Sequence, residues 1–370
     1  MSGRIKSLMW LIAVLMAVCP AGAYAIDVSA KSAILIEAET GKILYAENPH
    51  EKLPMASTTK IMTALVALEQ GNGEDTVTVD ASAYGTEGSS IYLHLEEEIA
   101  LKDLLYGLML SSGNDAAVAI AVHIGGGTQT FADMMNKKAM ELGAYNTNFV
   151  TPNGLHDDAH YTTAYDLARI AAEAMKNNEF REIVSTDYYR AETGEIARTF
   201  KNKNRILWEY PGGTGVKTGY TKAAGRCLVF SAQQDGMELI GVVLNCPNMF
   251  EDAKAMLDYG FENYETTVMV KSGAAAARVS VRGGEKSLLE LTPSRDIIVP
   301  VEKGSSASYR TRVVIEEDVS APVYKGDALG YVEVLDGDAL LLRRELVAAE
   351  DVPDAGINYY FDKIIKRFAA

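Results

Sequence analysis

The chain has 370 residues, carries a formal net charge of −15 and is 48% hydrophobic. This length is typical of two domains, and the apolar content is sufficient for a packed core in each. The acidic balance argues against nucleic acid as a partner, because proteins that bind nucleic acid concentrate lysine and arginine on their surfaces.

The first 25 residues have the three parts of a secretory signal peptide. Residues 4–6 carry two positive charges, residues 8–18 form an apolar run, and residues 23–25 have the sequence Ala-Tyr-Ala, a cleavage site of the A-x-A kind. The apolar run is short for a membrane span. Cys19 follows a valine, where a lipoprotein signal has a small residue, so lipidation is disfavoured. We therefore expect an exported protein from which this segment is removed.

A β-hairpin and then a buried helix are the next predicted elements. Alternating residues at 32–37 and 42–47 predict the hairpin. In residues 55–69 the apolar side chains recur at helical spacing, and a proline stands just before the start of the helix. Ser57 then falls in the first turn of this helix, and Lys60 lies one turn further on.

Ser57 and Lys60 are a candidate nucleophile and base. Residues three apart on a helix share a face, so the two side chains can come within hydrogen-bond reach. A serine hydroxyl attacks poorly unless a base removes its proton, and a lysine can do so only if burial or a nearby cation lowers its pKa. The four-residue S-x-x-K pattern also occurs by chance, so the pair alone does not establish catalysis.

Helices dominate the middle of the chain, after a short strand at 76–79. Capping residues mark their ends: three glycines follow the second helix, Thr128 is expected to cap the third, and Thr163 to cap the fourth. Ser112 and Asn114 form an S-x-N pattern in the turn between the first two. The helices are predicted at residues 101–110, 115–124, 128–142 and 163–176.

The chain then returns to strands and ends this part with a helix at 250–262. One strand carries the K-T-G pattern formed by Lys217, Thr218 and Gly219. Early strands, central helices and late strands together predict helices packed on an antiparallel sheet. The other predicted strands span residues 188–191, 196–200, 226–232 and 237–245.

Cys227 and Cys246 flank the last predicted hairpin, which turns at residues 235–236. With that turn, Gln234 pairs with Met237, and the two cysteines lie on one face but diagonal to each other. A disulfide would need a bulge or a shift in register, although export would permit one. Buried free thiols are therefore the expectation, with a disulfide as the alternative.

The three motifs occur in the order found in the penicillin-recognising enzymes with an active-site serine. From about residue 32 to about residue 352, the chain resembles the low-molecular-weight penicillin-binding proteins that are D-alanyl-D-alanine carboxypeptidases. The resemblance implies an α/β fold, with a β-lactamase/transpeptidase-like domain followed by a small all-β domain. Further segments that carry it are residues 151–155, 160–167 and 221–225.

The resemblance implies acyl transfer to Ser57. In this family the serine attacks the carbonyl between the two terminal D-alanines of a peptidoglycan stem peptide, with Lys60 as the base. Ser112 would relay a proton to the leaving amine, and Asn114 would hold Lys60 and the substrate amide. Penicillin would acylate Ser57 for the same reasons, and the chemistry requires no cofactor.

The K-T-G strand would bind the substrate. The resemblance implies that Lys217 and Thr218 hold the terminal carboxylate by charge-assisted contacts, while Gly219 lets the substrate lie against the strand. The backbone N–H groups of Ser57 and Tyr220 would form the oxyanion hole. Lys217 is also the cation expected to keep the lysine base uncharged.

A metal site is disfavoured. His156 and His160 are four residues apart with Asp157 and Asp158 between them, but the surrounding proline, asparagine and glycine predict a loop. The chain has no H-E-x-x-H pattern, and no G-x-S-x-G pattern surrounds Ser57.

Beyond about residue 266, short alternating runs predict a small all-β domain. This part contains no histidine or cysteine, so a spacer or docking module is expected rather than a second active site. The runs span residues 267–270, 277–281, 287–291, 297–301, 309–316, 329–335 and 339–348.

The last segment predicts a basic amphipathic helix, which can lie on an anionic membrane. The alternative is that it packs on its own β domain. The family's habit of using such an anchor favours a location at the outer face of the cytoplasmic membrane. The apolar face comprises Ile357, Tyr360, Phe361, Ile364, Ile365 and Phe368, and the basic face Lys363, Lys366 and Arg367. The expected segments are thus 1–25 (signal peptide), 26–265 (catalytic domain), 266–355 (β domain) and 356–370 (helix).

Three alternative functions share these motifs or this setting. A β-lactamase would hydrolyse its acyl-enzyme quickly, and a D,D-endopeptidase would cut peptide cross-links. A wall-binding protein without catalysis would be expected to have lost motif residues, and all of them are present here.

Overall fold

The computed structural model describes residues 26–305, 309–315 and 319–357, together with residues 359, 361 and 365. The predicted signal peptide, residues 1–25, lies outside the described residues. The same is true of most of the predicted terminal helix, including its three basic residues.

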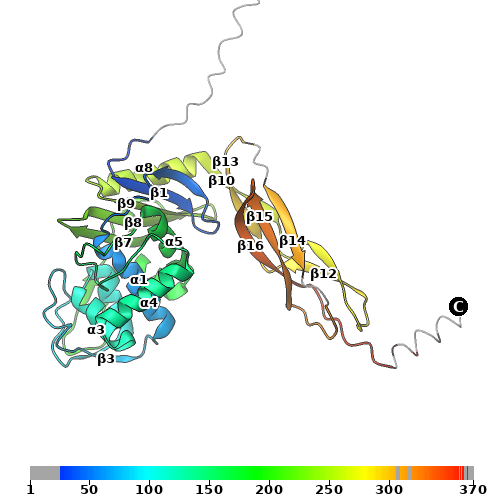
Figure 1. The fold of residues 1–370 in the computed structure, drawn as a ribbon, viewed down its shortest axis with the longest axis horizontal. Coiled ribbons are helices and arrows are strands. Elements are labelled where there is room, and N and C mark those ends of the chain that lie inside the picture. The colour runs from blue at the N-terminus through cyan, green and yellow to red at the C-terminus, as the bar shows by residue number, and fades with distance from the viewer. Residues whose placement is uncertain are drawn as a thin grey trace, which may run out of the picture.

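A five-stranded antiparallel sheet forms the centre of the first part, in the order β2-β1-β9-β8-β7. Helices cover both faces (Figure 1), so every residue of β1 is buried and its apolar run is almost continuous. β7 is an edge strand, paired only with β8 among the described strands. The strands are β1 (Ser32–Glu37), β2 (Ile43–Glu47), β7 (Gly213–Thr221), β8 (Gly225–Gln234) and β9 (Met237–Leu244).

Two apolar clusters lie on the two faces of this sheet. Side chains such as Ile34 and Val242 face the larger cluster, while Leu35 and Val243 face the other, as expected from the alternation along a strand. Helices α1–α6 contribute to the first cluster, and α7 and α8 cover the second. The helices are α1 (Lys60–Gln70), α2 (Leu101–Tyr106), α3 (Asn114–Gly125), α4 (Thr128–Glu141), α5 (Ala164–Ala174), α6 (Asn178–Ser185), α7 (Ile206–Glu209) and α8 (Met249–Asn263).

Some predicted helix ends differ from the observed ones. The helix predicted at 101–110 leaves α-helical geometry after Tyr106 and continues as a π-helical turn, η2 (Gly107–Ser111). Thr128 is the first residue of α4 and does not cap it, because Gly127 occupies the cap position. The predicted cap of α5 is present, since the Thr163 side chain accepts a hydrogen bond from Asp166 N. The short helices α6 and α7 had not been predicted.

The hairpin of β8 and β9 has the predicted register, with Gln234 opposite Met237. Cys227 and Cys246 are both buried free thiols, so the disulfide alternative is wrong. Two small antiparallel pairs complete this part. They are β3 (Thr76–Thr78) with β4 (Glu98–Ala100), and β5 (Tyr188–Arg190) with β6 (Thr199–Lys201).

The second part is all-β, as predicted. Strands β10 and β13 pair with each other, and a five-stranded sheet has the order β11-β12-β16-β15-β14 (Figure 1). Leu289, Leu291, Val334 and Leu346 belong to a core of its own. The strands are β10 (Tyr264–Val270), β11 (Ala277–Ser280), β12 (Leu288–Pro293), β13 (Ile297–Glu302), β14 (Arg310–Ile315), β15 (Ala328–Asp336) and β16 (Ala339–Ala348).

Polar side chains join the two parts. Lys42 Nζ, in the β1–β2 turn, donates to Tyr309 Oη at 2.7 Å and to Asp336 Oδ2 at 2.9 Å. Glu39, from the same turn, forms a 2.9 Å ion pair with Arg295. The seam between the parts therefore includes hydrogen bonds and ion pairs at its surface.

Near the end of the chain, Ile357, Phe361 and Ile365 are helical and exposed. Among the described residues, we find no helix with the length and apolar character needed to cross a bilayer.

Candidate active site

Ser57 lies in a 3₁₀ turn, η1 (Ala56–Thr59), that runs directly into α1. The Nζ atom of Lys60 lies 3.0 Å from Ser57 Oγ, so the structure brings this pair together in the way the sequence spacing predicts. Lys60 is completely buried, whereas Ser57 is partly exposed. A buried amine thus faces a partly exposed hydroxyl.

The environment of Lys60 strongly disfavours its charged form. Burial, followed by the charges of Lys217 and Lys203, lowers the pKa of Lys60 well below 10.5, and Asp115 only partly opposes this. Lys60 Nζ also contacts two oxygens, Asn114 Oδ1 at 2.7 Å and Asn153 O at 2.6 Å. These contacts orient the amine while its lone pair remains available to accept the serine proton.

Lys217 lies on edge strand β7 and is also buried, with Nζ donating to Thr218 O at 3.1 Å. Burial and then the charge of Lys203 lower the pKa of Lys217 to about 7. Thr218 is partly exposed next to it. A carboxylate arriving here would therefore meet a hydroxyl and a buried amine whose protonation it favours.

Gly219 allows β7 to approach η1 closely. A Cβ atom at this position would lie 3.1 Å from each of Met55 O, Ser57 N and Thr58 N. The missing side chain thus makes room for the turn that carries Ser57, in addition to the predicted space for substrate. Gly219 thus lies next to the backbone N–H of Ser57, one of the two groups of the predicted oxyanion hole.

Ser112 directly follows the π-helical turn η2 and adopts the left-handed conformation, with φ of 64°. Lys203 Nζ donates to the carbonyl of the preceding Ser111 at 2.6 Å. Lys203 is not among the predicted site residues. No local sequence pattern points to Lys203. It contacts the carbonyl of Ser111 and lowers the pKa values of Lys60 and Lys217 only because the fold brings these residues together.

Asn114 joins three segments. Its Oδ1 atom contacts Lys60, its Nδ2 atom donates to Glu87 O at 2.6 Å, and its backbone N–H donates to Ser89 O at 2.7 Å. The last two contacts attach α3 to residues 87–97, which we call the strap. The position of Asn114 against Lys60 therefore depends on the strap.

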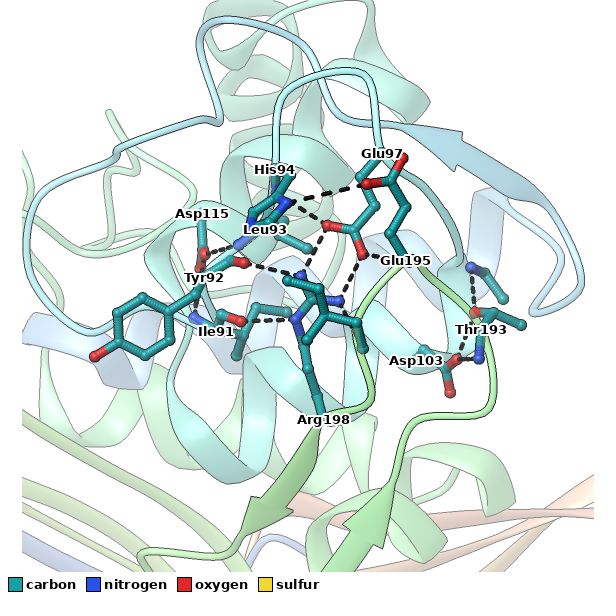
Figure 2. Close-up of polar contacts among 12 residues, drawn as sticks. Ile91, Tyr92, Leu93, His94, Glu97, Asp103, Asp115, Thr193, Glu195 and Arg198 are labelled. Atoms are coloured by element: carbon teal, nitrogen blue, oxygen red, sulfur yellow. Dashed lines mark hydrogen bonds and ion pairs between the residues drawn. The ribbon is translucent and has the colours of Figure 1, made fainter.

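Buried charges hold the strap in place, as Figure 2 shows. The carboxylate of Asp115 accepts hydrogen bonds from Ile91 N and Leu93 N. Arg198 forms a buried ion pair with Glu97 at 2.6 Å and donates from Nε to Ile91 O at 2.8 Å. Breaking one side of such a pair typically costs about 3–5 kcal/mol. These contacts hold the strap in place and, through the strap, hold Asn114 next to Lys60.

Asn153 was not among the predicted site residues. It lies in the segment 151–155, which was noticed only as part of the resemblance. Because a backbone carbonyl makes its contact with Lys60, no side-chain pattern could have revealed it.

The two histidines considered for a metal site have different surroundings. His160 is buried and contacts Thr59, whereas His156 is half exposed and lies 3.4 Å from Asp158. Within the described ranges, no three histidine, cysteine, aspartate or glutamate side chains are grouped so that they could hold a metal ion.

Comparison with known families gives two matches that cover most of the chain. Residues 19–248 match the model described as D-alanyl-D-alanine carboxypeptidase. Residues 264–354 match the model for the C-terminal domain of penicillin-binding protein 5.

Curated relatives are similar over nearly the whole length. The D-alanyl-D-alanine carboxypeptidase DacF of Bacillus subtilis is 39% identical over 338 residues, which cover 88% of this chain and 87% of that one. DacA of Haemophilus influenzae is 34% identical over 347 residues, covering 90% and 87%.

Solved structures show the same architecture. Penicillin-binding protein 5 of Haemophilus influenzae matches with a TM-score of 0.70 and 32% identity, over 89% of this chain and 99% of that one. A mutant of a Streptomyces DD-transpeptidase matches with a TM-score of 0.62 and 36% identity, over 64% of this chain and 99% of that one.

Proposed function

Because the chain belongs to the D-alanyl-D-alanine carboxypeptidase family, we propose that Ser57 is the nucleophile with which it releases the terminal D-alanine of peptidoglycan stem peptides. The family makes the chain a penicillin-binding serine carboxypeptidase. The assignment of roles to individual residues rests on the geometry of the cleft.

Acylation begins with proton transfer from Ser57 Oγ to the neutral amine of Lys60, over the 3.0 Å contact. The oxygen attacks the carbonyl carbon of the penultimate D-alanine, and the backbone N–H groups of Ser57 and Tyr220 stabilise the resulting oxyanion. The C–N bond then breaks, and the proton reaches the leaving amine through Ser112. D-Alanine departs, and an ester on Ser57 remains for water to hydrolyse.

Lys217 and Thr218 account for the selection of a free chain end. The buried lysine would bind the terminal carboxylate in a charge-assisted contact, which is stronger inside the protein than in water. Lys203 adds a second positive charge near Lys217, since its charge lowers the pKa of Lys217. A peptide without a terminal carboxylate would lose these interactions.

One observation carries the proposal: the buried amine of Lys60 contacts the serine hydroxyl in an environment that keeps the amine uncharged. Burying a lysine amine costs free energy, and a wall-binding protein without catalysis would gain nothing from it.

The experiment is to incubate the purified chain with benzylpenicillin and record its mass, and in parallel to measure D-alanine release from diacetyl-Lys-D-Ala-D-Ala. We expect one lasting penicillin adduct per chain, located on the peptide that contains Ser57, and steady D-alanine release. Rapid turnover of nitrocefin without a lasting adduct would instead identify a β-lactamase. Faster cleavage of a cross-linked dimeric peptide than of the free pentapeptide would identify an endopeptidase.

We also propose that the terminal helix binds the outer face of the cytoplasmic membrane after export. Ile357, Phe361 and Ile365 are spaced four residues apart and are 79%, 64% and 59% exposed, so they form an unburied apolar stripe. Lys363 and Lys366 lie between and beyond them in the sequence. An apolar stripe beside basic residues is typical of helices that lie in the headgroup region of anionic lipids.

Deleting residues 356–370 is expected to abolish co-sedimentation with phosphatidylglycerol vesicles and to leave D-alanine release from a soluble peptide unchanged. A matched variant, Phe361→Ser with Ile365→Ser, keeps every charge and should also lose most binding, because the apolar stripe supplies the insertion energy. Phosphatidylcholine vesicles test the role of the lipid charge. Equal binding of the full and shortened chains to anionic vesicles would refute the anchor.

A further inference from the structure

His160 is a buried histidine next to the catalytic residues that has no part in the reaction described above. Its side chain is 3% exposed and lies between residues 150–155 and the start of α1. Both ring nitrogens of His160 take part in hydrogen bonds. Nδ1 bonds to the backbone of residues 150–151, and Nε2 bonds to Thr59 in η1.

The partners of His160 determine where its proton lies. Nδ1 accepts hydrogen bonds from Val150 N at 3.0 Å and from Thr151 N at 3.4 Å, so it carries no proton. The neutral ring then has its proton on Nε2, which lies 2.7 Å from Thr59 Oγ1. The hydroxyl oxygen of Thr59 must accept the hydrogen bond from Nε2–H, because the hydroxyl proton of Thr59 is donated to Ala56 O at 2.8 Å. The three groups thus form a chain of hydrogen bonds with one direction.

This chain ends at the residue before the nucleophile. Ala56 has a φ of 49°, an unusual left-handed conformation for a residue with a side chain, and it sets the direction in which Ser57 leaves the turn. Residues 150–155 pack closely against the same carbonyl group. A Cβ atom at Gly154 would lie only 2.0 Å from Ala56 O, so only a glycine fits there. The neighbouring Asn153 O receives the bond from Lys60 Nζ.

We propose that His160 is a positioning residue for the catalytic pair. As a neutral imidazole it ties the loop that carries the Asn153 carbonyl to the turn that carries Ser57, and so fixes the base and the nucleophile relative to each other. The proposal rests on the function assigned to Ser57 and Lys60.

The surroundings of His160 favour the neutral form that this role requires. Burial lowers the pKa of His160 to about 4; the charge of Asp157 raises it, while those of His156 and Lys60 lower it. A protonated ring would direct an N–H at Val150 N and Thr151 N, which are themselves donors. The ring therefore stays neutral over the range in which the enzyme can be assayed, from about pH 5 to 9.

Three variants separate the two halves of the imidazole. In His160→Gln, the amide nitrogen can take the place of Nε2 and keep the bond to Thr59. In His160→Asn, the amide oxygen can take the place of Nδ1 and keep the bond from Val150. Thr59→Val removes the hydroxyl while retaining the shape. The control is His156→Gln, the same exchange at a half-exposed histidine in the same loop.

The measurement is the second-order rate of acylation by a fluorescent penicillin from pH 5 to 9, with the final label per chain and the melting temperature. We expect all three variants to reach full labelling but about 10- to 100-fold more slowly. The acid limb of the pH profile should move upward by about one unit, because burial is the main cause of the low pKa of Lys60 and a loosened loop admits water. Thr59→Val should add little in the His160→Asn background, since both break one chain.

A purely structural role would lower the melting temperature and leave the rate per labelled site and the acid limb equal to those of His156→Gln. That result would overturn the proposal. If the wild-type chain and the control are not labelled on Ser57 at all, the proposed function fails instead, so the two failures are distinguishable.

Discussion

Replacing Ser57 with alanine is expected to abolish penicillin labelling and to lower D-alanine release by about 10⁴- to 10⁶-fold, as for other nucleophiles that act as part of a unit. The variant removes the oxygen that lies 3.0 Å from Lys60 Nζ and on which the ester would form. Intact-mass measurement after penicillin treatment and a D-alanine assay with the soluble peptide check both effects.

Two controls accompany this variant. Ser82→Ala changes an exposed serine in a loop and should label like the wild type. Ser112→Ala should still form the adduct, more slowly, because it removes a proton relay and leaves the nucleophile. Undiminished labelling of Ser57→Ala would move the nucleophile elsewhere and refute the acyl-enzyme assigned here.

Lys60→Arg should lower the acylation rate by about 10²- to 10⁴-fold at every pH, the usual contribution of a general base. A guanidinium has similar length but stays protonated, so it cannot accept the serine proton. In the wild type, the rate should fall as the pH drops through the depressed pKa of Lys60, since protonation removes the base.

Lys217→Arg tests the alkaline limb of the pH profile, as Lys60→Arg tests the acid limb. The wild-type kcat/KM should decline above about pH 7, because Lys217 has a pKa of about 7 and its neutral form cannot bind the carboxylate by charge. An arginine stays charged, so this alkaline decline should disappear while the acid limb persists.

If Lys60→Arg instead retained the wild-type pH profile of acylation, Lys60 would not be the base.

Local spacing was enough to predict the contact between Ser57 and Lys60, because residues three apart share a helix face. The sheet of the first part and the all-β second part also followed from alternation and turn residues. The observed contact between Lys60 and Asn114 joins residues 54 apart. The family motifs anticipated that contact, whereas periodicity alone could not.

Other features depend on partners that local patterns do not identify. Glu97 and Arg198 are 101 residues apart, and each alone is typical of a solvated surface position. The carbonyl of Asn153 has no sequence signature, since every residue has one. The π-helical turn that begins at Gly107 is closely packed against residues distant in the chain, since a Cβ atom at Gly107 would lie 2.8 Å from Ile91 Cδ1 and 3.3 Å from Phe200 Cζ.

The seam between the two parts contains ionic and hydroxyl contacts, while each part closes an apolar core of its own. The ion pairs of Lys42 and Arg295 across the seam are partly exposed and contribute little to stability, whereas Arg344, which also pairs with Glu39, is buried. Because the two cores are separate, a chain that ends before Tyr264 is expected to fold and to keep Ser57 beside Lys60.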